Sequence, residues 1–254
     1  FNLLTYFFFF CQFRFTRPSN FPPIVKNLII INVLVWIAQL VFNKDYDLTN
    51  KIALYPIDTP YFKPYQIATH MFAHASYDAY GGIVFYHILF NMFTLWMFGK
   101  ILENVWGAKR FLFFYLSCGV GAALCHLLVQ HLRYDPVLIE QINIAISTNN
   151  QQEYDNLIPK IGGFLASAVG ASGAVMGVMV AFGFLFPNTE LFLMFIPVPI
   201  KAKWVIMGLV ALDLFGGISP LQGDNIAHFA HLGGAITGFI IVYIWNKTNR
   251  KTLY

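Results

Sequence analysis

The chain has 254 residues, of which 57% are hydrophobic and only 11% are charged, and its mean hydropathy is +0.60. Soluble domains carry about 25% charged residues, so this composition excludes an ordinary soluble protein and favours a membrane protein. The three cysteines are too few for a disulfide framework, and we interpret them as small core residues.

Counted in spans of about 20 apolar residues, the chain predicts six membrane-spanning helices. In chain order they cover roughly residues 27–42, 83–102, 111–132, 172–186, 204–214 and 226–245. We therefore expect an all-α, polytopic membrane protein: a six-helix bundle in which a short central helix carries Ser172.

The regions outside and around these spans define the expected domains. Residues 1–23 are predicted to form a cytoplasmic or interfacial segment, residues 24–246 the six-helix domain, and residues 247–254 a cytoplasmic tail. Within the domain, residues 131–162 form a polar insert on the outer side. The run Ser147-Thr148-Asn149-Asn150-Gln151-Gln152 within it indicates a surface excursion with some helix of its own.

The distribution of charge predicts an orientation. If both termini are cytoplasmic, the cytoplasmic segments hold eleven basic and two acidic side chains, and the outer segments hold five basic and ten acidic ones. The positive-inside rule favours this arrangement, and it requires an even number of spans. The prediction is a bacterial plasma membrane protein with both termini in the cytoplasm.

A serine and a histidine are predicted at membrane depth. Ser172 lies in Gly-Ala-Ser-Gly at the outer end of the fourth span, and His231 lies in Ala-His-Leu-Gly-Gly near the outer end of the sixth. A polar or ionisable side chain in a membrane span indicates a functional site, and a histidine is the base that activates a serine nucleophile. Because Asp213 and Asp224 are assigned to the outer loop, we expect a dyad without a carboxylate.

Close packing of these two spans is predicted by glycines four residues apart, Gly173 and Gly177 on one and Gly234 and Gly238 on the other. Acyl transfer also needs donors for the developing oxyanion. His87 and Asn91 share a face in the outer half of the second span. They are the candidate donors, together with the backbone N–H of Ser172.

These residues, in this order, resemble the rhomboid family of intramembrane serine proteases. The resemblance covers about residues 24–245 and rests on Gly170-Ala171-Ser172-Gly173, His87-x-x-x-Asn91, and His231 with Gly234. Two further stretches match as well. Gln66 with Thr69-His70-Met71-Phe72-Ala73-His74 resembles the first loop of the family, and Glu103-Asn104-Val105-Trp106-Gly107-Ala108-Lys109-Arg110-Phe111 resembles the turn after the second span.

The resemblance implies Ser172 as nucleophile, His231 as general base, and His87, Asn91 and the Ser172 N–H as the oxyanion hole. It assigns structural roles to His70, His74, Glu103 and Gly234. Two positions depart from the family. Tyr65-Gln66 replaces the Trp-Arg of some members, and Met176 replaces a tyrosine that stacks on the histidine in others. We therefore expect other side chains to hold the first loop in place and to orient the ring of His231.

The function so implied is hydrolysis of peptide bonds in or near transmembrane segments of other membrane proteins. The site is expected to open to the outer side, and the partners are transmembrane substrates and the bilayer, with no cofactor, metal or nucleic acid. There are three alternatives. A zinc site is suggested by the spacings His70-x-x-x-His74 and His228-x-x-His231, but further ligands are lacking. The chain could also be an inactive relative that only binds membrane helices, or a transporter, which would show repeated halves that the sequence lacks.

Overall fold

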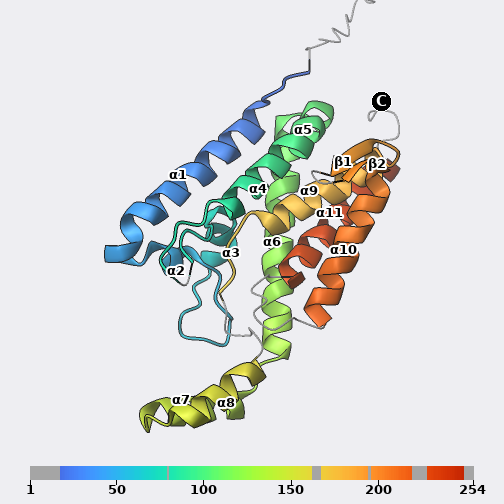
Figure 1. Ribbon diagram of the computed structural model, residues 1–254. Helices are drawn as coiled ribbons and strands as arrows, with labels where there is room; N and C mark the ends of the chain where they lie inside the picture. The colour runs from blue at the N-terminus through green and yellow to red at the C-terminus, as the bar shows by residue number, and fades with distance from the viewer. Residues whose placement is uncertain (1–17, 79, 162–166, 194–195, 219–227, 249–254) are drawn as a thin grey trace, which may run out of the picture.

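The computed structural model describes residues 18–78, 80–161, 167–193, 196–218 and 228–248 (Figure 1). In chain order, its elements are α1 (Pro23–Tyr46), α2 (Leu48–Ile52), α3 (Gln66–Thr69), η1 (His70–Phe72), α4 (Tyr86–Thr94), η2 (Leu95–Gly99), α5 (Lys100–Trp106), α6 (Ala108–Leu132), α7 (Pro136–Ser147), α8 (Gln151–Ile161), α9 (Ser172–Leu185), β1 (Glu190–Leu193), β2 (Ile196–Lys201), α10 (Ala202–Ile218) and α11 (His228–Thr248).

The helical membrane fold predicted from the sequence is confirmed. Each of the six apolar spans is helical, and the second is a rod in which the π-helical turn η2 joins α4 to α5. Three described helices are long and apolar enough to cross a membrane, namely Pro23–Asn43, Ala108–Leu132 and His228–Thr248. α9 is a shorter apolar helix of 14 residues, about 21 Å long at 1.5 Å per residue.

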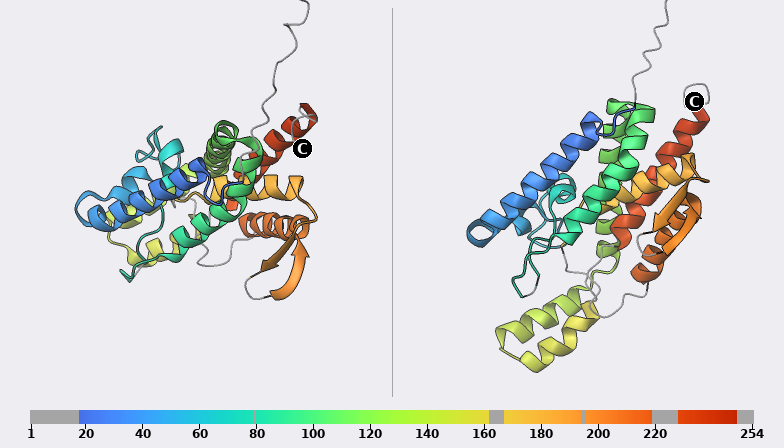
Figure 2. Two further views of the ribbon diagram at one scale, coloured as in Figure 1. Left: turned by 90° about the horizontal axis from the view of Figure 1, so that it is seen from above. Right: turned by 45° about the horizontal axis from the view of Figure 1, so that its top comes forward.

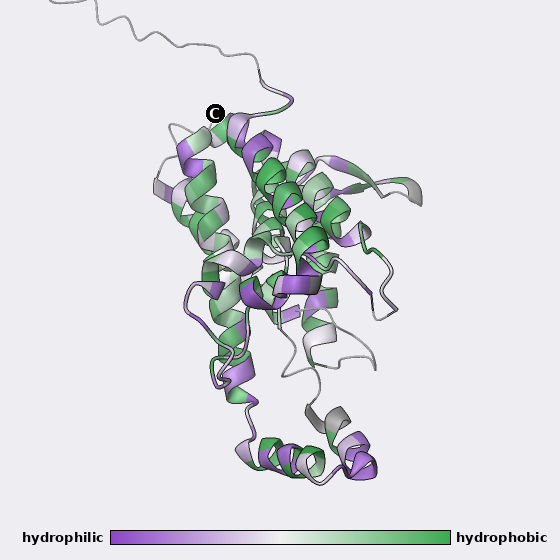
Figure 3. Ribbon diagram, turned by 90° about the vertical axis from the view of Figure 1, so that its left-hand side faces the viewer, coloured by the Kyte–Doolittle hydropathy of each residue, from purple (hydrophilic) through white to green (hydrophobic). Residues whose placement is uncertain are grey.

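The surface of the bundle is apolar. Between 22% and 39% of the three long spans is buried inside the protein, so most of their hydrophobic side chains face outward. Figure 3 shows hydrophobic residues along the lengths of the bundle helices. In water this surface would be unfavourable by about 25 cal/mol per Å², whereas lipid tails solvate it.

The centre of the bundle is the packing of α9 and α11 against each other and against α6 (Figure 1). A side chain on Gly234 would collide with the backbone carbonyl of Gly173, and a Cβ on Gly238 would lie 2.8 Å from the Cα of Gly177. The four glycines predicted to mediate this contact therefore do meet. They allow the two helix backbones to touch.

Glu103 attaches α1 to the bundle. Its carboxylate is buried and accepts hydrogen bonds from the backbone N–H groups of Ile24 (2.9 Å) and Val25 (2.8 Å). These N–H groups lie in the first turn of α1, where no intrahelical acceptor exists and a negative charge is favoured by the helix dipole. The contact is consistent with the structural role that the resemblance implies for Glu103.

Two hairpins extend from the bundle. The strands β1 and β2 pair antiparallel, with Glu190 opposite Lys201, and they lie beside α10 at the end of the bundle far from α1 (Figure 2). This small sheet was not among the predicted elements, although Ile196, Val198 and Ile200 alternate in the manner of a strand. The insert of residues 131–162 forms the helical pair α7 and α8, which pack on each other.

The glycine contact predicts a difference between two alanine substitutions. Gly234→Ala must separate α11 from α9, and overpacking of this kind costs about 1–3 kcal/mol. Gly208→Ala, in α10, places its Cβ where nothing lies within 4 Å, so it is expected to leave stability unchanged or slightly raised. Thermal unfolding in detergent measures both. Equal midpoints for the two variants would contradict the tight α9–α11 contact.

Candidate active site

Ser172 and His231 form a hydrogen-bonded pair at the N-terminal ends of two central helices, α9 and α11. Ser172 is the first residue of α9, and His231 lies in the first turn of α11. The distance between Ser172 Oγ and His231 Nε2 is 2.8 Å. This is within the range of about 2.6–3.2 Å at which a base takes the proton of a nucleophile.

The chain that leads to Ser172 is held by backbone hydrogen bonds to the first loop. Leu54 and Ala168 exchange two bonds of 2.9 Å, and the N–H of Gly170 donates to the carbonyl of His70 at 2.9 Å. Gly170 has a φ of +130°, which favours glycine. Non-helical backbone is tolerated at membrane depth only when it is satisfied inside the protein, and these bonds satisfy it.

The ring of His87 lies beside Gly170. A Cβ built on Gly170 would be 3.0 Å from His87 Nε2 and 3.5 Å from Ser172 Oγ. His87 Nδ1 accepts a hydrogen bond from the backbone N–H of Ala75 at 3.2 Å. A neutral imidazole that accepts at Nδ1 carries its proton on Nε2, so His87 presents an N–H donor toward the region beside Ser172.

Asn91 follows His87 by one turn on the same face of α4 and is buried. Its Nδ2 donates one hydrogen bond to the backbone carbonyl of His87 at 2.9 Å. The amide nitrogen carries two hydrogens, so this bond fixes the orientation of the side chain while a second N–H remains available to an acceptor.

His70 and His74 support the first loop. His70 Nδ1 is 2.9 Å from the carbonyl of Gln66. Gln39 of α1 holds His74 by accepting from its N–H at 3.0 Å and donating to its carbonyl at 2.9 Å. The rings of His74 and His87 meet edge to face, 5.2 Å between centroids. His74 therefore packs behind the candidate oxyanion donor.

Asp213 corrects the prediction that no carboxylate reaches the histidine. The fifth span does not end at Leu214 but continues as α10 through Phe215-Gly216-Gly217 to Ile218, because glycines in a membrane helix permit close packing and need not end it. Asp213 thus lies in a helix, buried, with Oδ1 2.9 Å from His231 Nδ1 and 2.8 Å from His228 Nδ1. The other predicted loop carboxylate, Asp224, lies outside the described residues.

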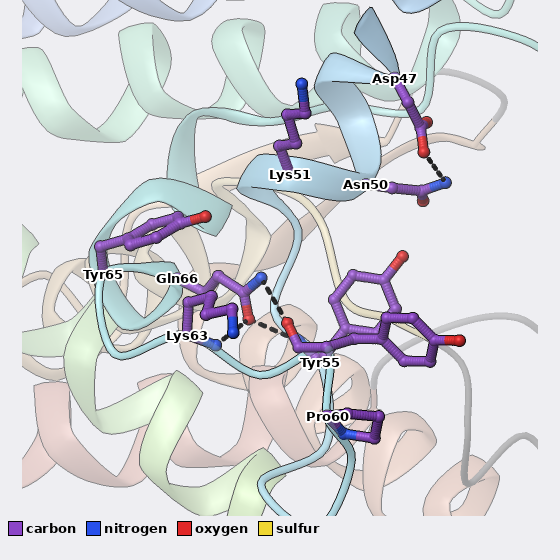
Figure 4. Close-up of a pocket in the computed structure, with 9 residues that line it drawn as sticks. Asp47, Asn50, Lys51, Tyr55, Pro60, Lys63, Tyr65 and Gln66 are labelled. Carbon is purple, nitrogen blue, oxygen red and sulfur yellow. Dashed lines mark hydrogen bonds between the residues drawn. The ribbon is translucent and has the colours of Figure 1, made fainter.

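A surface pocket of about 500 Å³ lies in the first loop (Figure 4), and the residues that line it come from positions 47–66: Asp47, Asn50, Lys51, Tyr55, Pro60, Tyr61, Lys63, Tyr65 and Gln66. Gln66 closes the loop beneath it. Its side chain accepts from the N–H of Lys63 at 3.0 Å and donates to the carbonyl of Tyr61 at 3.2 Å. The pocket is formed by the loop and is separate from the residues around Ser172.

Comparison with known proteins gives a family match. The model of the Rhomboid domain matches residues 61–248, which include every candidate catalytic and oxyanion residue. Similar proteins include Rhomboid protein 1, mitochondrial, of Saccharomyces cerevisiae, 29% identical over 161 residues, which are 63% of this chain and 38% of that protein. RHOMBOID-like protein 12, mitochondrial, of Arabidopsis thaliana is 29% identical over 218 residues, 85% of this chain and 56% of that protein.

A third similar protein is Presenilin-associated rhomboid-like protein, mitochondrial, of Bos taurus, 30% identical over 175 residues, 66% of this chain and 37% of that protein. The matched part of this chain thus spans between 37% and 56% of the length of these three relatives. All three are mitochondrial by name. The prediction of a bacterial plasma membrane is therefore wrong, because the distribution of charge indicates an orientation and does not identify the compartment.

The buried histidines predict how stability depends on pH. Burial, and secondarily the neighbouring His87, lower the pKa of His74 from 6.5 to about 3, and burial also lowers the pKa of His70. Below pH 6.5 the unfolded chain binds protons that the folded protein excludes, so stability falls as the pH falls. One such histidine removes about 2 kcal/mol between pH 6.5 and pH 5.

We therefore expect the unfolding midpoint in detergent to be lower at pH 5 than at pH 7.5, and the difference to shrink in His74→Gln. The comparison is made within each variant, so a general loss of stability in the variant does not affect it. An identical pH dependence in the parent and in His74→Gln would contradict the assignment of a buried, neutral His74.

Proposed function

Because this chain belongs to the rhomboid family, we propose that it is an intramembrane serine endopeptidase that cleaves other membrane proteins in or near their transmembrane segments. The observation that carries the proposal is the 2.8 Å hydrogen bond between Ser172 Oγ and His231 Nε2 in an apolar helical bundle. A histidine that accepts from a serine at this distance is suited to general-base catalysis.

The chemistry follows from the geometry of the pair. Ser172 Oγ attacks the carbonyl carbon of the scissile bond while His231 Nε2 takes the hydroxyl proton. The same nitrogen then returns the proton to the leaving amine, which gives an acyl-enzyme on Ser172. Water, deprotonated by His231, hydrolyses this ester and restores the serine.

Three N–H groups are proposed to bind the oxyanion of each tetrahedral intermediate. They are the Nε2–H of His87, the Nδ2–H of Asn91 and the backbone N–H of Ser172. The last belongs to the first turn of α9, where N–H groups have no intrahelical acceptor and the helix dipole favours negative charge. In surroundings of low dielectric constant, such fixed donors stabilise the intermediate more strongly than water does.

The relatives support a mitochondrial membrane as the location of this chain, since the three named above are mitochondrial proteins. The substrates proposed are membrane proteins, because an active site within a lipid-facing bundle meets transmembrane segments that diffuse in the same bilayer. The competing proposal is a rhomboid-like protein that binds such segments without cleaving them. The hydrogen-bonded serine and histidine favour the enzyme.

Cleavage of a tagged single-span membrane protein in liposomes tests the proposal. The parent is expected to cleave it, and Ser172→Ala and His231→Ala are each expected to lower the rate by on the order of 10⁶, which leaves no detectable product in this assay. Ser147→Ala, an exposed serine on α7, serves as the matched control and should cleave as the parent does. Undiminished cleavage by Ser172→Ala would refute the proposal, and capture of intact substrate by the parent would favour the binding protein.

The oxyanion hole is tested separately. His87→Phe keeps a ring of similar shape but removes the N–H donor, and Asn91→Leu removes the amide. Each variant is expected to lower kcat on the order of 10²–10³ with little change in KM, because the donors act on the intermediate and not on the bound substrate. Steady-state kinetics measures both values. A rise in KM at constant kcat would assign these residues to substrate binding instead.

A further inference from the structure

Asp213 is a buried carboxylate in a membrane-spanning helix, only 8% exposed, and among the described residues it pairs with two histidines of α11. The atom Oδ1 lies 2.9 Å from His231 Nδ1 and 2.8 Å from His228 Nδ1. His231 Nε2, on the other side of the same ring, bonds Ser172 Oγ at 2.8 Å. The three side chains thus form a line from α10 through α11 to α9.

The packing of α10 against α11 holds the carboxylate in place. Asp213, Gly216 and Gly217 share one face of α10. A Cβ on Gly216 would lie 2.5 Å from the His228 ring, and one on Gly217 would lie 3.0 Å from the Phe229 ring. The missing side chains therefore let α11 approach the face that carries Asp213.

Arg133 of the α6 C-terminus contacts both the end of α10 and the start of α11. It stands at the end of α6, its Nη2 donates to the carbonyl of Gly217 at 3.1 Å, and its guanidinium lies 4.9 Å from the centre of the Phe229 ring. Asp213 and His231 lie about 7.5 Å and 4.5 Å along the helix axes from the end of α10 and the start of α11, at 1.5 Å per residue. The Arg133 contacts therefore join the two helix ends within about one and a half turns of both side chains.

We propose that Asp213 is a positioning residue for the serine protease reaction and completes a Ser172–His231–Asp213 triad. This inference rests on the function proposed above. An ionised carboxylate only accepts hydrogen bonds, so the contact requires the proton of neutral His231 to sit on Nδ1. Nε2 is then left unprotonated and faces the hydroxyl that it must deprotonate.

Asp213 also acts during the proton transfer without receiving a proton. When Ser172 Oγ bonds to the carbonyl carbon, its proton moves to His231 Nε2, and the imidazolium then carries protons on both nitrogens. The carboxylate stays ionised and stabilises the positive charge at 2.9 Å. When Nε2 passes its proton to the leaving amine, the ring returns to its starting tautomer, so all charges balance.

The contact between Asp213 and His228 suggests a different, purely structural role, in which Asp213 only links α10 to α11. The two roles predict different kinetics. If Asp213 positions His231, its substitution lowers kcat and alters the tautomer of His231. If Asp213 only links the helices, its substitution lowers stability and has the same effect as substitution of His228.

The first experiment compares Asp213→Asn, Asp213→Glu and His228→Gln in the liposome cleavage assay. An amide can donate to Nδ1 and so favours the wrong tautomer, and kcat of Asp213→Asn is expected to fall on the order of 10³–10⁴ at nearly constant KM. Asp213→Glu should recover part of that loss, and His228→Gln should lose less than about tenfold. Asp58→Asn is the matched control, because Asp58 pairs with His131 at 3.0 Å outside the site.

Parent-like cleavage by Asp213→Asn, or an equal loss in His228→Gln and Asp213→Asn, would overturn the inference. Either result leaves the proposed function intact as long as Ser172→Ala abolishes cleavage by the parent, so the two failures are distinguishable.

The second experiment measures the parent protein, and a variant serves only to assign its signal. Nitrogen-15 NMR of the histidine-labelled parent in detergent, with His231→Gln to assign the signal, reports which ring nitrogen carries the proton. A protonated Nδ1 on His231 at neutral pH is expected. A neutral ring protonated on Nε2 would overturn the proposal.

Discussion

The close contact between α9 and α11 is the interaction on which the rest of the site depends. Gly173 and Gly177 meet Gly234 and Gly238 without side chains between the two backbones, and this brings the first turns of the two helices together. In a bilayer the hydrophobic effect does not drive helices together, so such packing is a main source of their association. The 2.8 Å bond between Ser172 and His231 is a consequence of it.

A second constraint is that polar groups at membrane depth must find partners within the protein. It accounts for the first loop, whose backbone bonds Ala168 and Gly170, and for Gln39, which holds His74. It also accounts for Ala75, whose N–H sets the tautomer of His87. The bond from Ala75 also orients the His87 ring, whose Nε2 lies near Gly170 beside Ser172.

Much of this arrangement could be predicted from the sequence, because apolar spans, charge asymmetry and paired glycines each have a direct physical meaning. The six helices, the short α9 and the pairing of Ser172 with His231 follow from them. The place of Asp213 could not be predicted, because Phe215-Gly216-Gly217 was interpreted as the end of a helix when it is a packing face within one. The bond from Ala75 to His87 also required the structure, since it joins a loop to a helix twelve residues away.

The central claim is that His231 makes Ser172 a nucleophile, and covalent labelling tests it without a substrate. The purified protein is treated with a fluorophosphonate, and the modified residue is identified by mass spectrometry. The account predicts that Ser172 alone is labelled and that labelling is lost in His231→Ala, although the serine is still present. Labelling of Ser172 that persists in His231→Ala, or an unlabelled parent, would contradict it.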